Sequence, residues 1–116
     1  MFDFDICERD GLSGDARVTA LSHSRDTLTA REMVRLKVRE QRKRLNLKGH
    51  VPLTRLADDD AEALVERQIE TACSAITGGQ ILVFIDGRQI TGLDEAFPLA
   101  PPPKIEFIRL VQLKGG

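Results

Sequence analysis

The sequence contains no tryptophan and no tyrosine, and it has only two cysteines and two histidines. Without Trp and Tyr the chain offers few rings on which bases can stack, which disfavours a nucleic-acid binding site. Cys7 and Cys73 lie far apart and form no CxxC pair, and only His23 and His50 accompany them. This set disfavours a metal site and a disulfide framework, so we expect both cysteines to be buried as small apolar residues.

Long hydrophobic runs are also missing. No stretch approaches the ~20 apolar residues of a membrane span, and Asp3 and Asp5 stand where a signal peptide would be apolar. We therefore expect a cytoplasmic protein without a membrane partner. The sequence shows no Ser/His/Asp group, no phosphate-binding glycine loop and no ligand cluster. These absences indicate a protein that is not an enzyme and has no cofactor of its own.

Charge is balanced overall but unevenly distributed. The net charge of −1 over 116 residues gives no global field that would favour nucleic acid or an anionic membrane. Residues 31–48 contain eight basic and two acidic residues, whereas residues 58–70 contain six acidic residues and one basic residue. We expect these two segments of opposite sign to pair in space.

The first part of the chain predicts a hairpin followed by a helix. Alternating apolar and polar residues at positions 2–7 and 16–22 are typical of strands with one buried face, and the segment between them is rich in turn formers. Thr29 and Glu32 have the spacing of a capping box, which predicts a helix start. The expected apolar stripe of this helix consists of Ala30, Met33, Val34, Val38 and Leu45, with Leu36 beside it.

A second helix is predicted from about residue 59 to 76. Acidic residues occupy its start, where they suit the helix dipole, and Gly78 and Gly79 follow its end. Its apolar stripe consists of Ala61, Leu64, Val65, Ile69, Ala72 and Ile76. After it, residues 81–85 form a nearly continuous apolar run, and Asp86-Gly87 predicts a two-residue hairpin that returns through residues 88–90.

Near the end of the chain, the proline-rich segment 97–103 lacks amide donors, so we expect a stiff surface crossing and no sheet interior. Residues 104–111 are predicted to form the last strand. Its alternation places Arg109 on the same side as the apolar Phe107 unless a bulge intervenes.

The last eight residues read RLVQLKGG. Glycine loses the most backbone entropy on ordering, so two glycines at an extreme end do not stabilise a fold. They suit an extended segment that enters a narrow site. Five extended residues, 112–116, reach about 17 Å at roughly 3.4 Å each.

This layout resembles the β-grasp fold, and the C-terminal part of the chain resembles ubiquitin and its relatives. The residues that carry the resemblance are the apolar strand and turn LVFIDGRQ at 82–89, the proline loop and the final RLVQLKGG, together with the loop Gly11-Leu12-Ser13-Gly14. The resemblance implies an α+β protein in which a mixed β-grasp sheet packs on a helix. Residues 1–111 would form one domain and residues 112–116 an extended tail. Residues 49–79 exceed the family pattern and carry the additional helix, inserted between the first helix and the third strand.

The function implied by the resemblance is that of a ubiquitin-like protein modifier, of the kind found in bacteria. An activating enzyme would use ATP to adenylate the carboxylate of Gly116, and enzymes would then carry it as a thioester and conjugate it to target proteins; a deconjugating protease would reverse the reaction. Gly115 would supply steric clearance, while Leu113 and Lys114 would fix the register. Gln112 replaces the arginine that ubiquitin's activating enzyme reads, which implies a dedicated enzyme.

Two other functions remain open at this point. A sulfur carrier of the same fold would convert the adenylated Gly116 into a thiocarboxylate. A β-grasp interaction module would not be conjugated at all, and its tail would have no chemistry.

The resemblance also implies a partner-binding patch on the exposed sheet face, formed by Leu12, Phe84 and Leu110. The alternative is that Phe84 belongs to the core, because residues 81–85 do not alternate.

The basic helix face, represented by Arg35, Arg39, Arg42 and Lys43, has no interleaved aromatic residues, so we do not expect it to bind nucleic acid. The simpler interpretation is that this basic face is exposed to solvent and has no partner. The functional interpretation is that it docks on an acidic surface of an enzyme.

Overall fold

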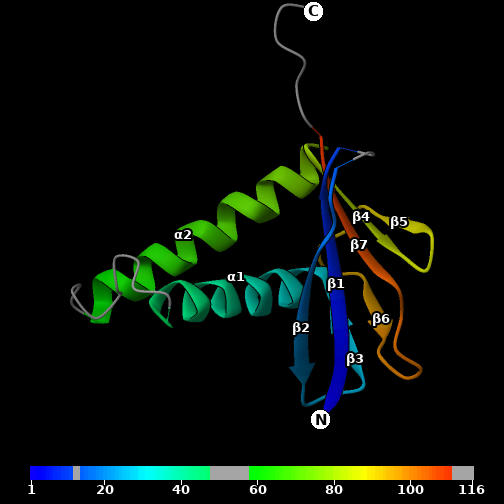
Figure 1. The fold of residues 1–116 in the computed structure, drawn as a ribbon, viewed down its shortest axis with the longest axis horizontal. Coiled ribbons are helices and arrows are strands. Elements are labelled where there is room, and N and C mark those ends of the chain that lie inside the picture. Colours follow the sequence, from blue (N-terminus) through cyan, green and yellow to red (C-terminus); the bar gives the residue numbers. More distant parts are fainter. Residues whose placement is uncertain (12–13, 48–57, 111–116) are drawn as a thin grey trace, which may run out of the picture.

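The computed structural model describes residues 1–11, 14–47 and 58–110, and it describes the side chains of this part of the chain except those at positions 44–47 and 58–60. Two helices and seven strands follow one another in these described ranges (Figure 1). Their order is β1 (Phe2–Asp10), β2 (Arg17–His23), β3 (Thr27–Thr29), α1 (Ala30–Leu47), α2 (Asp58–Thr77), β4 (Ile81–Ile85), β5 (Arg88–Ile90), β6 (Ala96–Pro98) and β7 (Ile105–Arg109).

Five of these strands form one mixed sheet with the order β2-β1-β7-β4-β5. The last strand, β7, therefore lies at the centre, parallel to β1 and antiparallel to β4. The hairpins β1-β2 and β4-β5 flank it on either side. The helices pack against this sheet, so the protein has an α+β fold with a mixed five-stranded sheet.

The turn between β4 and β5 confirms the predicted two-residue hairpin. Asp86 and Gly87 both have positive φ, 52° and 82°, as a type I′ turn requires. The turn is also tied to the start of β7, because the backbone N–H of Lys104 donates to Asp86 Oδ1 at 2.8 Å. The Asp86 N–H donates in return to the Lys104 carbonyl at 2.8 Å.

Helix α1 begins with the predicted capping box. The Glu32 N–H donates to Thr29 Oγ1 at 3.1 Å, and the Thr29 N–H donates to Glu32 Oε1 at 3.2 Å. These two bonds satisfy amides that the first helical turn leaves free. The bond from the Thr29 backbone is the main reason why the pKa of Glu32 lies below its ordinary value.

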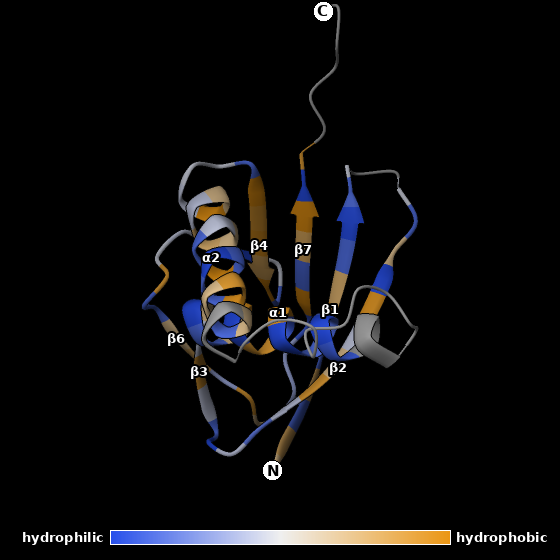
Figure 2. Cartoon of the chain, turned by 90° about the vertical axis from the view of Figure 1, so that its left-hand side faces the viewer, coloured by the Kyte–Doolittle hydropathy of each residue, from blue (hydrophilic) through white to orange (hydrophobic). Residues whose placement is uncertain are grey.

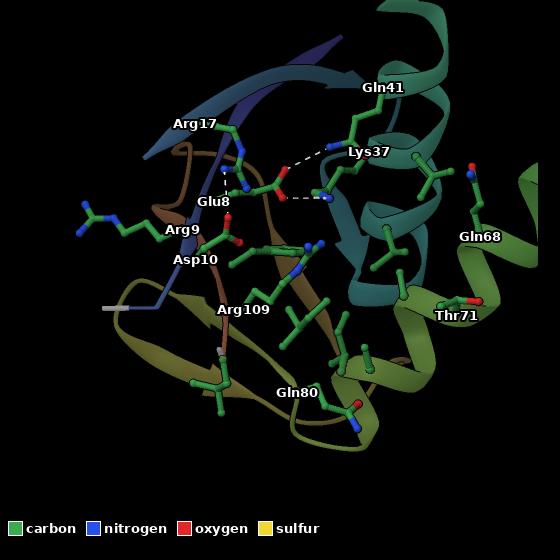
Figure 3. Close-up of a pocket in the computed structure, with 18 of the residues that line it drawn as sticks. Glu8, Arg9, Asp10, Arg17, Lys37, Gln41, Gln68, Thr71, Gln80 and Arg109 are labelled. Carbon is green, nitrogen blue, oxygen red and sulfur yellow. Dashed lines mark hydrogen bonds and ion pairs between the residues drawn. The ribbon is translucent and has the colours of Figure 1, made fainter. Parts of the chain in front are cut away.

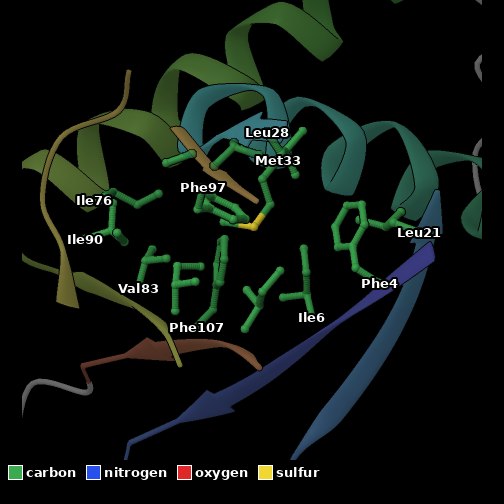
Figure 4. Close-up of a cluster of buried hydrophobic side chains, with 14 of the residues drawn as sticks. Phe4, Ile6, Leu21, Leu28, Met33, Ile76, Val83, Ile90, Phe97 and Phe107 are labelled. Carbon is green, nitrogen blue, oxygen red and sulfur yellow. The ribbon is translucent and has the colours of Figure 1, made fainter. Parts of the chain in front are cut away.

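One cluster of buried side chains connects the sheet with both helices. Met33 of α1 lies at its centre, with Phe97 on one side and Ile6 and Phe107 of the sheet below it (Figure 4). Strand β4 is hydrophobic along its whole length, whereas β1 ends in hydrophilic residues (Figure 2). The predicted stripe of α1 is confirmed where its side chains are described, since Ala30, Met33, Val34 and Val38 are all buried.

Helix α2 contributes to the same core. Val65, Ile69 and Ile76 of the predicted stripe are buried, and so is Cys73, which lies between them on the helix. Burial raises the pKa of the Cys73 thiol. Within the described ranges, neither helix combines the length and the apolarity that crossing a lipid bilayer requires.

The structure corrects the prediction for the proline-rich segment. Instead of a crossing without strands, β6 pairs with β3 in a separate two-stranded sheet, in which Leu28 lies opposite Phe97. Phe97 and Leu99 are buried. A proline is tolerated here because Pro98 is the last residue of a short strand that has only one neighbour. Phe97 and Leu99, on either side of Pro98, anchor the segment to the core.

The capping box predicts a specific stability loss. We expect Thr29→Ala to lower the free energy of unfolding by about 1 kcal/mol, because the cap hydroxyl that accepts the Glu32 amide is lost. Chemical denaturation measures this difference, and Thr27→Ala on the same strand is the control, since Thr27 is exposed. Equal losses in the two variants would contradict the cap.

The same cap should depend on pH. The folded-state pKa of Glu32 is lowered, so its contribution is complete above the pKa of the unfolded chain and is lost as the pH falls through the folded value. The difference in free energy of unfolding between the wild type and Glu32→Gln, whose side chain cannot ionise, should therefore shrink in acid. If the difference in free energy of unfolding stayed the same at a pH low enough to protonate Glu32, the Glu32 carboxylate would not take part in the cap.

Helix α2 should behave as part of the core. We expect Ile69→Ala to lower the free energy of unfolding by about 3 kcal/mol, because a buried side chain is replaced by a cavity. Glu70→Ala, on the exposed side of the same helix, is the control and should change it little. A single unfolding transition with no loss for Ile69→Ala would mean that α2 does not pack on the sheet.

Candidate functional site

The end of β7 is the place where the chain leaves the sheet. The Leu110 N–H donates to the carbonyl of Gln80 at 2.9 Å, and the Gly11 N–H donates to the carbonyl of Arg109 at 2.7 Å. These bonds hold the exit point between the end of α2 and the end of β1. The predicted tail residues, Gln112, Leu113, Lys114, Gly115 and Gly116, lie outside the described residues.

The sheet has an outer face that both helices leave open. Val83 and Ile85 belong to the core on the helix side, so Leu82 and Phe84 point to the opposite side. Phe84 is half-buried and lies outside the core cluster. The structure therefore favours the surface interpretation of Phe84 over the core interpretation, because α2 lies on the same side of the sheet as α1.

Two further apolar residues extend this surface, and sequence reasoning did not single them out. Ile108 lies opposite Leu82 across the β4-β7 ladder, on the outer face. We call Leu82, Phe84 and Ile108 the outer-face patch. Val18, which is 59% exposed, lies on the neighbouring hairpin, opposite Cys7. The unbroken apolar run at 81–85 hid the patch, because it contains no alternation that would separate two faces.

The three predicted patch residues do not form one cluster. Leu110 is 47% exposed at the end of the sheet, whereas Phe84 lies opposite Glu106. Leu110 is four positions beyond Glu106 along the chain, which corresponds to about 13 Å in an extended strand. Leu82 and Ile108 fill part of this interval, while the third predicted residue, Leu12, lies outside the described residues.

Charged residues border the outer-face patch. Arg9 lies beside Ile108 in the parallel β1-β7 ladder. Its Nε is buried and has no hydrogen-bond partner among the described residues. An arginine can cover apolar surface with its stem while its charged end stays in water, which explains why Ile108 is buried on a face that carries no helix. Glu106, half-buried, lies beside Phe84 on the same face.

The regular β4-β7 register also settles the position of Arg109. The pairs run without a bulge from Ile85 opposite Ile105 to Ile81 opposite Arg109. Arg109 thus lies on the same side as Phe107, the side of the helices. It is nevertheless exposed, because the core ends before it and a groove opens there.

The basic helix face is largely engaged within the molecule. Arg35 Nη1 lies 2.6 Å from Glu66 Oε1, and Arg39 Nη2 lies 2.6 Å from Glu62 Oε1. Arg42 donates from Nε to Gln68 Oε1 at 2.9 Å. Three of the four predicted docking cations therefore contact α2, and the fourth, Lys43, is exposed.

These contacts confirm the predicted pairing of the basic and the acidic segment. The hydrogen bond between Arg39 and Glu62 raises the pKa of the guanidinium and lowers that of the carboxyl. Partly exposed pairs of this kind set the register between two helices more than they add stability.

No protein-family model, no curated protein and no solved structure matches this chain. Within the described ranges, no three side chains of His, Cys, Asp or Glu gather as a metal site would require. The described part of the site consists of an apolar sheet face and the point at which the chain leaves the sheet.

Two phenylalanines test the assignment of the two sheet faces. We expect Phe107→Ala to lower the free energy of unfolding by about 3–5 kcal/mol, because Phe107 is buried in the core. Phe84→Ala on the opposite face should cost about 1 kcal/mol. Urea denaturation of both variants gives the comparison, and equal losses would mean that Phe84 is packed as tightly as a core residue.

Proposed function

We propose that this protein is a ubiquitin-like protein modifier with a β-grasp fold, of bacterial type, that works in the cytoplasm. One observation carries the proposal: the strand that runs into Leu113-Lys114-Gly115-Gly116 is the central strand of a mixed sheet, paired in parallel with the first strand. Strand β7 is thereby held on both sides, so the body of the protein can be docked while the segment beyond it enters another protein's site.

The chemistry requires activation of the C-terminal carboxylate, which is a poor electrophile at neutral pH. An oxygen of the Gly116 carboxylate attacks the α-phosphorus of ATP, and pyrophosphate leaves, so that an acyl adenylate forms. A thiolate of the enzyme then displaces AMP to give a thioester. A lysine amine of the target displaces the thiol, loses a proton and forms an isopeptide bond. The modifier is the substrate throughout, and ATP is consumed by the activating enzyme.

The folded body supplies the contact surface in this proposal. The outer-face patch is apolar, bordered by Arg9 and Glu106, and covered by neither α1 nor α2, which are properties of a partner-binding surface. The six residues from 111 to 116 span about 20 Å when extended. An activating enzyme docked on the patch would therefore reach Gly116 across that distance.

The partner enzymes would be dedicated to this chain. Gln112 stands at the position that an arginine occupies in ubiquitin, so an enzyme that reads this arginine would lose a charged contact. Activating enzyme, conjugating enzyme, target proteins and a deconjugating protease are the partners that the proposal requires.

One experiment tests the proposal against its alternatives. The protein is incubated with ATP and adenylating enzymes of the ubiquitin-activating class purified from its source organism, and intact-mass spectrometry follows the C-terminus and larger adducts. Adducts on protein lysines are expected. A mass increase equal to the replacement of one oxygen by sulfur would instead identify a sulfur carrier, and a chain that never reacts would be an interaction module.

Removal of Gly116 should separate reactivity from folding. We expect the shortened chain to form neither adenylate nor adduct, because Leu113-Lys114-Gly115 would end at the wrong distance from the nucleotide. The melting temperature should stay within about 1 °C of the wild type, since an extreme end buries little surface. The exposed substitution Thr27→Ala is the control for the reaction and should leave it intact. A large loss of stability on removal of Gly116 would contradict the idea of a free tail.

A further inference from the structure

Helix α2 creates a groove on the helix side of the sheet. The two helices lie close together at their far end and diverge toward the sheet, so they leave a wedge in front of the ends of β1 and β7 (Figure 1). This wedge is a groove of about 720 Å³. Ligand pockets commonly measure roughly 300–1,000 Å³, so the groove is large enough for several side chains of a partner.

The floor of the groove is apolar. Val34 and Val38 of α1, Ala72 and Ile76 of α2, and Phe107 of β7 contribute to it. These side chains belong to the core or pack against it, which means that the groove gives access to the edge of the core. An apolar floor attracts apolar side chains because their burial removes surface from water.

A polar cluster closes one wall. Glu8 of β1 accepts a hydrogen bond from Gln41 at 3.4 Å and lies 3.2 Å from Lys37 Nζ (Figure 3). The Glu8 and Lys37 side chains are only 11% and 12% exposed. Lys37 Nζ also lies 5.5 Å from the centre of the Phe107 ring, within the range of a cation–π contact. The charge of the Glu8 carboxylate is thus neutralised by Lys37 of the same chain.

The groove carries an excess of positive charge. Of the described residues, six basic and two acidic ones line it, and one of the six, Arg9, points away from it (Figure 3). The second carboxylate, Asp10, is also engaged, at 3.4 Å from Arg17. Among the described residues, neither Arg67 nor Arg109 has an acidic partner. The whole chain has a net charge of −1, so this excess is local.

The groove therefore combines an apolar floor with two arginines, on different walls, that have no acidic partner in the described part of the chain. Arg67 lies on α2, and Arg109 extends from the end of β7 into the groove (Figure 3). We infer that the groove binds an acidic amphipathic segment of a partner protein, whose apolar side chains cover the floor and whose carboxylates meet Arg67 and Arg109. This inference does not depend on the chemistry of the C-terminal tail.

Two labelled peptides test the inference on the full chain. One is an acidic amphipathic peptide of leucine and glutamate, about twelve residues and roughly 18 Å long as a helix, and the other has lysine in place of every glutamate. We expect fluorescence anisotropy to show saturable binding of the acidic peptide, at least about tenfold tighter than that of the lysine peptide. Equal affinities, or no saturable binding of the acidic peptide up to about 1 mM, would overturn the inference.

Charge variants locate the contact. Arg67→Glu and Arg109→Glu should each weaken binding of the acidic peptide about tenfold and strengthen binding of the lysine peptide. Arg25→Glu changes the net charge equally but lies on an exposed loop away from the groove, so it should have little effect. If all three substitutions weakened peptide binding equally, the net charge of the protein would explain the attraction, and the groove would not be the binding site.

A steric pair gives an independent check. Ala75 lines the groove, whereas Ala63 is exposed earlier on the same helix. Ala75→Phe should fill the groove and abolish peptide binding, and Ala63→Phe should not. Thermal denaturation verifies that both variants fold, and retained binding by a folded Ala75→Phe variant would exclude the groove.

The last measurement separates a protein segment from a small ligand. If dodecanoate binds, Arg109→Glu abolishes its binding and the acidic peptide does not bind, the groove is a site for small amphipathic anions and the inferred partner is wrong. Peptide binding that shifts the amide resonances of the outer-face patch, and leaves those of Thr71 and Ala75 unchanged, would likewise assign the peptide to the other side of the sheet.

Discussion

The burial of inward-facing side chains of β1, β7 and β4 against α1 is the constraint on which the rest of the structure depends. Ile6, Val83 and Met33 are completely excluded from solvent at this contact, and each such side chain contributes roughly 1.5–3 kcal/mol when it leaves water. Because side chains alternate along a strand, this one contact also decides what faces outward. It places Phe84 and Ile108 on the open side of the sheet, where the outer-face patch lies.

The same constraint explains the position of α2 and the groove beside it. The apolar stripe of α2 has to be buried, and α1 together with β4 offers the surface for it on the helix side. Pairing of Arg35 with Glu66 and of Arg39 with Glu62 fixes the far parts of the helices together. The ends of the two helices that lie next to the sheet must diverge. The carbonyl of Gln80, which follows α2, accepts a hydrogen bond from the Leu110 N–H at the end of the sheet. The groove is thus a result of holding one helix at both ends.

The molecule then presents two different surfaces. The outer-face patch is apolar and lies on the side without helices, while the groove is apolar at its floor, cationic at its walls and lies on the side of the helices. Both lie close to the end of β7, from which residues 111–116 continue. In the proposed modifier, one partner can hold the sheet face while another occupies the groove, whose lining includes Arg109 and Leu110 at the chain exit.

The sequence by itself determined the features that depend on neighbouring residues. The Thr29–Glu32 capping box, the type I′ turn at Asp86-Gly87, the stripes of both helices and the pairing of oppositely charged segments follow from local spacing and composition. Only the tertiary structure decided that Phe97 joins a second small sheet, that Phe84 lies on the outer face and not in the core, and that Arg109 reaches a groove without a bulge. These features depend on which distant segments meet, and a chain of residues carries no local signal for the space that two diverging helices leave between them.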